Sequence, residues 1–161
     1  MSDGFFDGSA ELFTSGTVRR AAGSYREGKP EGSWSFWDSG GSRIAVFTFR
    51  AGILEGQTKL YFGSFGAPQA AEKLKVGGTM KSGWWSGTIR SWYSDGSRRS
   101  ERFYEGGKVL RASAHDGDGA SYSESAAMER AHRDDASDRE LISLLAAIIC
   151  EAPDHAQRRT P

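Results

Sequence analysis

The sequence predicts a mainly β protein, in which stacked antiparallel β-hairpin repeats form a single twisted sheet capped by C-terminal α-helices. Three observations predict this class. Glycines and aromatic residues recur at a regular spacing, short runs rich in aromatic and β-branched residues alternate with Gly, Asp and Ser clusters, and a segment with helical periodicity follows them.

The regular spacing is clearest in the unit that starts at Gly32. An aromatic residue follows at Trp37, a turn glycine at Gly41, and then Phe49 and Gly52. The same spacing gives three further copies: Gly8, Phe13, Gly16, Tyr25 and Gly28; Gly56, Tyr61, Gly66, Leu74 and Gly77; Gly87, Trp92, Gly96, Tyr104 and Gly107. Repetition of this kind indicates stacked supersecondary units, so we expect one hairpin unit to recur over residues 8–107.

Within a unit, the strands are predicted by residue type. Residues 33–37 and 43–49 are rich in aromatic and β-branched residues, and Asp38-Ser39-Gly40-Gly41 between them suits a hairpin turn. Because side chains alternate along a strand, Ala45, Phe47 and Phe49 are expected on one face and Ile44, Val46 and Thr48 on the other.

The link between the third and fourth units departs from the pattern. Gly28 to Gly32 and Gly52 to Gly56 are short links, whereas the stretch from Gly77 to Gly87 is longer. This stretch contains Trp84 and Trp85, so we predict an inserted loop that carries two tryptophans. Each could bury roughly 150–250 Å² by folding back over the sheet or by meeting a partner.

The segment Tyr25-Arg26-Glu27-Gly28-Lys29-Pro30-Glu31-Gly32-Ser33-Trp34-Ser35-Phe36-Trp37 resembles the MORN-repeat variant of bacterial YwqK-like antitoxin proteins. Residues 49–61 and 104–108 match this pattern in part. The resemblance implies a stack of hairpins that binds a protein, such as a toxin or effector encoded nearby. MORN repeats have also been proposed to bind membrane surfaces peripherally.

The composition changes after Lys108. We predict a repeat domain at 1–111, a linker at 112–120, a helical cap at 121–152 and a disordered tail at 153–161. Ser121-x-x-Glu124 and Ser137-x-x-Glu140 fit capping boxes and predict two helices. The second, over about 138–151, carries apolar residues at helical spacing and precedes Pro153; we expect it to pack on the last hairpin or across a dimer interface. The apolar residues are Leu141, Leu144, Leu145, Ile148 and Ile149.

The overall composition favours a protein of the cytoplasm. The 161 residues contain 21 basic and 21 acidic side chains, so no net charge attracts nucleic acid or an anionic membrane. Cys150 is the single cysteine, which suits a reducing compartment, and the first residues lack the features of a secretory signal.

The candidate site residues are aromatic and arginine side chains that would bind a protein partner, because these residue types dominate interface energetics. They are Trp34, Trp37, Tyr61, Trp84, Trp85, Trp92, Tyr93, Arg98 and Arg102. For the repeated positions Trp37, Tyr61 and Trp92, packing between the hairpins is the favoured interpretation and an exposed binding strip is the alternative. For Trp84 and Trp85 the two interpretations are equal.

The sequence indicates no catalytic, metal or cofactor site. Asp116-Gly117-Asp118-Gly119 begins like a calcium loop, but Ala120 and Ala127 stand where the pattern needs oxygen ligands, so a flexible linker is expected. His115, His132 and His155 lie near no recognisable nucleophile motif, and no phosphate-binding glycine motif is present. The arginines near Arg98 alternate with glutamates, which favours a solvated face over a nucleic-acid patch.

We therefore expect a non-catalytic protein-binding repeat module, and by the resemblance an antitoxin, immunity or regulatory protein. The alternative is a structural protein that self-associates through its open hairpin edge or through its C-terminal helix, or that binds membrane surfaces peripherally.

Overall fold

The computed structural model describes residues 7–14, 18–64 and 70–155. The disordered tail was expected at 153–161; residues 153–155 instead belong to the C-terminal helix, and residues 156–161 lie outside the described residues. The strands are β1 (Gly8–Thr14), β2 (Val18–Arg26), β3 (Lys29–Trp37), β4 (Arg43–Arg50), β5 (Ile53–Leu54), β6 (Gly56–Tyr61), β7 (Leu74–Lys81), β8 (Trp84–Trp92), β9 (Arg98–Glu105) and β10 (Lys108–Ala114). One helix follows, α1 (Glu124–His155).

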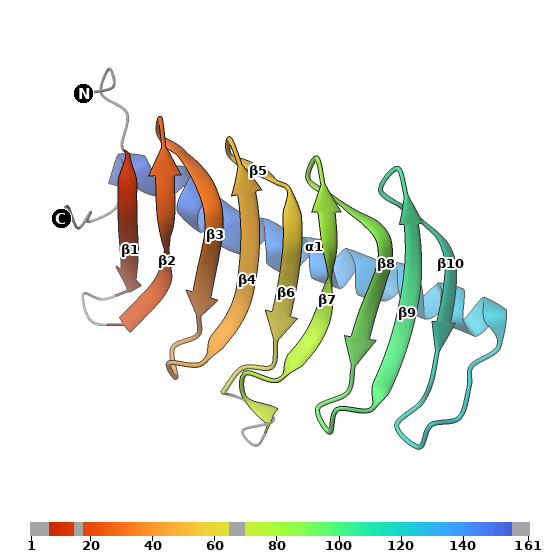
Figure 1. The fold of residues 1–161 in the computed structure, drawn as a ribbon. Helices are drawn as coiled ribbons and strands as arrows, with labels where there is room; N and C mark the ends of the chain where they lie inside the picture. Colours follow the sequence, from red (N-terminus) through yellow and green to blue (C-terminus); the bar gives the residue numbers. More distant parts are fainter. Residues whose placement is uncertain (1–6, 15–17, 65–69, 156–161) are drawn as a thin grey trace.

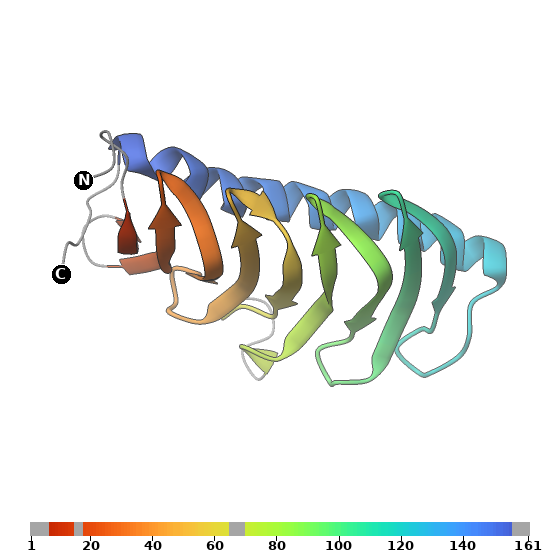
Figure 2. The same cartoon turned by 45° about the horizontal axis from the view of Figure 1, so that its top comes forward.

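The strands form one open, ten-stranded antiparallel sheet, which confirms the predicted fold class. Their order in the sheet is their order in the sequence, with the short β5 paired to β4 beside the main path. Figures 1 and 2 show α1 running back across one face of this sheet, from beside β10 to beside β1. The molecule therefore has two layers, one of which is a single helix.

Two-residue turns along one edge of the sheet repeat through the molecule. They are Glu27-Gly28, Ala51-Gly52, Ser82-Gly83 and Gly106-Gly107, and all eight residues have positive φ. A hairpin turn of the type I′ class requires positive φ at both positions, which explains the glycine at the second one. These turns mark the boundaries between the strands at equivalent positions of the four units.

The third unit differs from its prediction. Met80 and Gly83 occupy the roles expected for Leu74 and Gly77, both of which lie within β7. The expected loop with Trp84 and Trp85 is wrong, because these residues begin β8 directly after the turn. The extra residues of this unit lie between the end of β6 and the start of β7. Glycine spacing alone could not place the insertion, because Gly77 and Gly78 supply glycines in the wrong phase.

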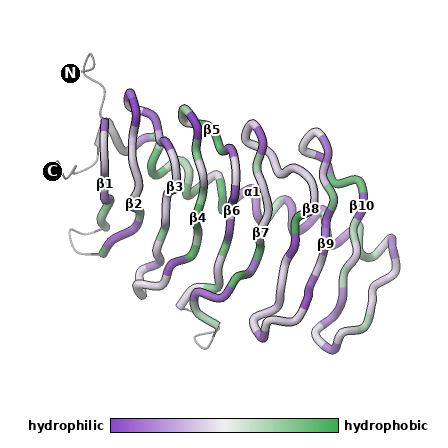
Figure 3. Tube along the Cα trace, in the orientation of Figure 1, coloured by the Kyte–Doolittle hydropathy of each residue, from purple (hydrophilic) through white to green (hydrophobic). Residues whose placement is uncertain are grey.

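The core lies between the sheet and α1. Figure 3 shows hydrophobic and hydrophilic residues following one another along the strands. The face toward α1 buries Trp34 and Phe36 of β3 and, as predicted, Ala45, Phe47 and Phe49 of β4. The helix contributes Ile142, Leu145 and Ile149, all at most 4% exposed. A Cβ at Gly23 would lie 2.2 Å from the Trp34 ring, so the indole of Trp34 requires glycine there.

The C-terminal region contains one continuous helix, so the prediction of two helices is wrong. Ser123 caps its start, with Oγ accepting a hydrogen bond from the Ala126 N–H at 3.2 Å, whereas Ser121 forms a β-bridge with His115. The box at Ser137 begins no new helix because no glycine or proline interrupts residues 124–152. The stretch expected as a linker includes the end of β10 and a turn in which Asp116 Oδ1 accepts from the N–H groups of Asp118 and Ala120.

The last turns of α1 are fastened to the first hairpins. Pro153 lies inside the helix and has no N–H to donate to the carbonyl of Ile149, four residues earlier. The Tyr25 hydroxyl donates to that carbonyl at 2.6 Å. A side chain from β2 thus satisfies the backbone group that the proline leaves free. None of the described residues forms a helix with the length and hydropathy needed to cross a membrane.

The packing of α1 can be tested with two adjacent leucines. Leu145 is 4% exposed and Leu144 is 61% exposed. Leu145→Ala is expected to lower the free energy of unfolding by about 2–5 kcal/mol, because it leaves a cavity between helix and sheet. Leu144→Ala is expected to change it by less than about 0.5 kcal/mol. Urea denaturation followed by circular dichroism measures both, and equal losses would contradict this packing.

Candidate protein-binding surface

The face of the sheet opposite α1 is not covered by any described element (Figures 1 and 2). On this uncovered face, the four aromatic positions of the repeat fall into one line. Leu12, Phe36, Leu60 and Ser91 are buried on the helix-facing side. The residues that follow them are Phe13, Trp37, Tyr61 and Trp92, and these point to the opposite face because side chains alternate along a strand.

The cross-strand partners of these aromatics complete the line. Phe13 pairs with Arg19, Trp37 with Arg43, Tyr61 with Leu74, and Trp92 with Arg98. Aromatic side chains and arginines therefore alternate from strand to strand, with Leu74 as the one exception. We call this set the aromatic–arginine row: Phe13, Arg19, Trp37, Arg43, Tyr61, Leu74, Trp92 and Arg98.

A β-bulge accompanies each pair of the row. In all four hairpins, the register shifts immediately before the aromatic residue. In two of the hairpins, the extra residue on the partner strand turns toward the helix side: Ile44 packs against the core, and Arg99 reaches Asp134 of α1. A bulge of this kind can send one side chain inward while the aromatic residue and its cross-strand partner stay on the uncovered face.

Neighbouring hairpins are linked along the row by stacking. The guanidinium carbon of Arg19 lies 3.9 Å from the Trp37 ring centroid, and that of Arg43 lies 5.1 Å from the Tyr61 centroid. Cation–π contacts at exposed sites contribute about 0.5–1 kcal/mol each. They also hold the rings in place, so a partner would meet side chains that are already ordered.

Beside the row, the uncovered face carries mostly small or flexible side chains. Register pairing aligns Ala22, Ser35, Val46, Lys59, Gly77 and Arg90 across six strands. The Gly77 position lies against Leu74 and the Trp92 ring, where a Cβ would be 3.6 Å and 3.9 Å away. These side chains project little from the sheet, so the aromatic–arginine row borders an open, shallow surface.

A turn at the lower edge is held by the Asp38 carboxylate. It accepts hydrogen bonds from the N–H groups of Gly40, Ser42 and Ser64 and from the Ser64 hydroxyl. Desolvation raises the pKa of Asp38, but these hydrogen bonds outweigh it and lower the pKa overall. The anchored turn directly follows Trp37 and fixes the end of β3 next to the row.

The opposite face contains a polar cluster beneath α1. Arg99 donates to the Asp134 carboxylate through both terminal guanidinium nitrogens, at 2.7 and 3.1 Å. Arg102, which is 1% exposed, donates to Asp138 at 2.6 Å and to the Tyr104 hydroxyl at 2.9 Å. Desolvation works against the charge of Arg102, but the Asp138 carboxylate outweighs it and raises the pKa of Arg102.

The Tyr104 hydroxyl completes this cluster by donating to Asp135 at 2.8 Å. Burial, assisted by the hydrogen bond to that carboxylate, raises the pKa of Tyr104. The phenol therefore keeps its proton over the physiological range and acts as a donor. The cluster fixes the helix on β9 through side chains that are hydrogen-bonded to one another.

The structure divides the predicted site residues into three groups. Trp37, Tyr61, Trp92 and Arg98 lie together in the row. The three aromatics are half-buried on the uncovered face: Trp37 lies against Arg19, Tyr61 against Arg43, and Trp92 beside Gly77 of the neighbouring strand. They therefore combine packing between neighbouring hairpins, the favoured interpretation, with a place on the exposed strip, the alternative. Trp34, Trp85 and Arg102 are at most 3% exposed and lie in the core or the polar cluster. Phe13 was recognisable as the repeated aromatic of the first copy but was not among the predicted site residues. Arg19 and Arg43 were not predicted, although the arginines occupy matching strand positions.

The remaining two predicted residues lie at opposite edges of the sheet. Trp84 is 51% exposed, with the Arg139 guanidinium carbon 4.8 Å from its ring centroid. Tyr93 donates through its hydroxyl to the His115 carbonyl and accepts from Arg130, so it fastens the start of α1. Among the described residues, no group of three or more His, Cys, Asp and Glu side chains is placed to hold a metal ion.

Comparison with known proteins gives no significant match to a family model, a curated protein or a solved structure. The resemblance to MORN-repeat proteins stays a prediction from the sequence.

The buried ion pair yields a stability test. Asp138→Ala is expected to lower the free energy of unfolding by about 3–5 kcal/mol, because it leaves the Arg102 charge buried without its partner. The double variant Arg102→Met/Asp138→Leu removes both charges and is expected to lose much less. Urea denaturation compares them, with Glu140→Ala on the exposed side of α1 as the control. A double variant as unstable as Asp138→Ala would refute this account.

Proposed function

We propose that this chain is a non-catalytic protein-binding module that docks a partner protein on the uncovered face of its sheet. The observation that carries the proposal is the aromatic–arginine row. It contains three of the seven tryptophan and tyrosine candidates, Trp37, Tyr61 and Trp92, on a face that no described element covers. Trp, Tyr and Arg are the residue types enriched among interface hot spots.

The dimensions of the row suit a protein partner. It crosses eight strands, and neighbouring strands lie about 4.8 Å apart, so it extends for about 34 Å. A standard interface buries about 800 Å² on each partner. The row and the shallow line beside it can supply a surface of that order, with the stacked rings as its least hydrated part.

The kind of partner follows from the sequence resemblance. YwqK-like proteins are antitoxins, so the partner is proposed to be a toxin or effector protein encoded by the neighbouring gene. The chain would then act as an immunity or regulatory protein that occupies the partner by surface contact.

Self-association through a sheet edge is the second candidate. The edge strand β10 exposes Leu110 to 49%, and open edges can pair with another strand. The helix offers less for this role, since Ile142, Leu145 and Ile149 pack on the sheet of the same chain. Sedimentation at high concentration measures this candidate directly, because a monomer throughout excludes it.

The main proposal is tested by co-expression with the neighbouring gene product. We expect a complex that co-purifies, and a loss of affinity of about tenfold or more for Trp37→Ala or Trp92→Ala, equivalent to about 1.4 kcal/mol or more per anchor. Calorimetric titration of the purified partners measures the dissociation constants.

Leu144→Ala is the control, because Leu144 is a large exposed apolar residue on α1, away from the uncovered face. It is expected to leave the dissociation constant within about twofold. Absence of a complex, or a complex that is insensitive to both changes in the row, would count against the proposal.

A further inference from the structure

The turn edge of the sheet carries a contact that repeats between successive hairpins. Gly8, Gly32, Gly56 and Gly87 all have positive φ, and they pair with Tyr25, Phe49, Met80 and Tyr104 of the next hairpin. These four pairs are structurally equivalent. Beyond each pair the strands separate, and the space between them is filled by the residues that precede the glycine.

In the first three copies, the residue before the glycine is acidic and its carboxylate binds the next turn. Asp7 Oδ1 accepts from the Glu27 N–H at 2.5 Å. Glu31 Oε1 accepts from the Ala51 N–H at 2.9 Å, and Glu55 Oε1 accepts from the Ser82 N–H at 3.2 Å. In each case the donor is the first residue of the two-residue turn.

A backbone contact reinforces the two central copies. The Gly52 N–H donates to the Pro30 carbonyl and the Gly83 N–H to the Leu54 carbonyl, both at 2.9 Å. One carboxylate and one carbonyl thus satisfy both free N–H groups of each turn.

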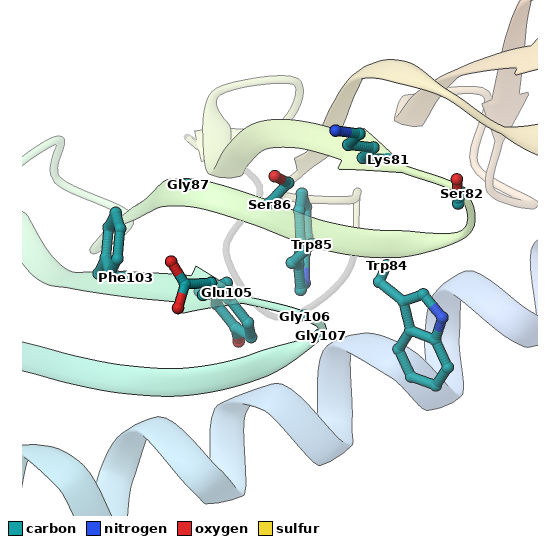
Figure 4. A pocket seen from close by; sticks show the side chains of 11 residues that line it. Lys81, Ser82, Trp84, Trp85, Ser86, Gly87, Phe103, Glu105, Gly106 and Gly107 are labelled. Carbon is teal, nitrogen blue, oxygen red and sulfur yellow. The ribbon is translucent and has the colours of Figure 1, made fainter.

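The fourth copy lacks the carboxylate. Ser86 stands at the acidic position, and its side chain is too short to reach the next turn. No described residue accepts a hydrogen bond from the N–H of Gly106, the first residue of that turn. A groove of about 570 Å³ opens there, between the start of β8 and the turn after β9 (Figure 4). Its walls include Trp85, Ser86, Gly87, Glu105 and Gly106.

We propose that this groove receives the carboxylate of a glutamate side chain from a protein partner. The side chain would take the place that Glu31 and Glu55 fill in the equivalent copies, and its carboxylate would accept the Gly106 N–H. The inference rests on the proposed protein-binding function but concerns a different surface, at the turn edge. The ligand chemistry is taken from the molecule itself, since the chain fills the equivalent space with a carboxylate three times.

The charges around the groove decide how strongly a carboxylate binds. Lys81 and Glu105 are the charged residues among those that line it, so the lining has no net charge. The positions equivalent to Glu105 hold Arg26, Arg50 and Lys81 in the other units. Glu105 therefore opposes an acidic ligand, and Glu105→Arg restores the charge of the other copies.

The experiment uses the full chain labelled with ¹⁵N and blocked glutamate, N-acetylglutamate N-methylamide, as the probe. The Gly106 amide resonance is expected to shift and to saturate at millimolar concentration. Blocked glutamine is expected to bind about tenfold more weakly, because charged acceptors form the stronger hydrogen bonds. Two variants set the direction: Ser86→Glu fills the groove from within and abolishes the shift, and Glu105→Arg tightens binding severalfold.

Ser113→Glu is the matched control, because it adds the same charge at an exposed position on β10; it is expected to leave the titration unchanged. No saturable shift at Gly106, or an unchanged shift in Ser86→Glu, would overturn the inference. Tighter binding of blocked lysine than of blocked glutamate, lost in Glu105→Arg, would overturn it in favour of a basic ligand.

The same variants separate this inference from the proposed function. In a complex with the neighbouring gene product, weakening by Ser86→Glu without an effect of Trp37→Ala supports the groove and refutes the row. Weakening by Trp37→Ala alone supports the row and refutes the groove as a contact of that partner.

Discussion

The fold depends on the cover that α1 gives to one face of an open sheet. A single antiparallel sheet has two faces, and it cannot bury apolar side chains unless a second layer packs on one of them. The helix supplies that layer for the whole width of the sheet, as Figure 2 shows. Because one face is covered, the side chains that alternate along each strand fall into two sets: those on the helix side form the core, and those on the other side form the surface.

The helix is matched to the sheet in two different ways along its length. Its C-terminal half presents Ile142, Leu145 and Ile149 to the aromatic part of the core. Its N-terminal half presents Asp134, Asp135 and Asp138, which meet Arg99, Tyr104 and Arg102. An apolar contact alone tolerates sliding, whereas charged hydrogen bonds are directional. The polar contacts therefore fix the position of the helix on the sheet, and the apolar contacts bury its hydrophobic side chains.

Much of the fold was predictable from the sequence because glycine spacing and residue type are local signals. The hairpin class, the alternation in β4 and the aromatic positions five residues after each repeat glycine follow from them. The boundaries of the third unit could not be predicted, because Gly77 and Gly78 stand where the spacing expects a turn glycine. Glycine is needed at Gly78 for another reason: a Cβ there would lie 2.2 Å from Ile89. The face of the sheet on which Trp37 lies could not be predicted either, because it depends on a β-bulge and on the face that the C-terminal helix covers.

The candidate binding features come from two opposite properties of the repeat. The row exists because the units share one feature: each hairpin has a bulge at the equivalent position, and the four bulges align four aromatic residues on the uncovered face. The groove exists because one unit differs from the others in sequence: it has Ser86 at the acidic position and Glu105 at the basic position. In a repeat protein each unit contacts mainly its neighbours, so such a change disturbs one interface and leaves the stack intact. A substitution of this kind can therefore open a site without loss of the fold, and the internal copies show what the opened site has lost.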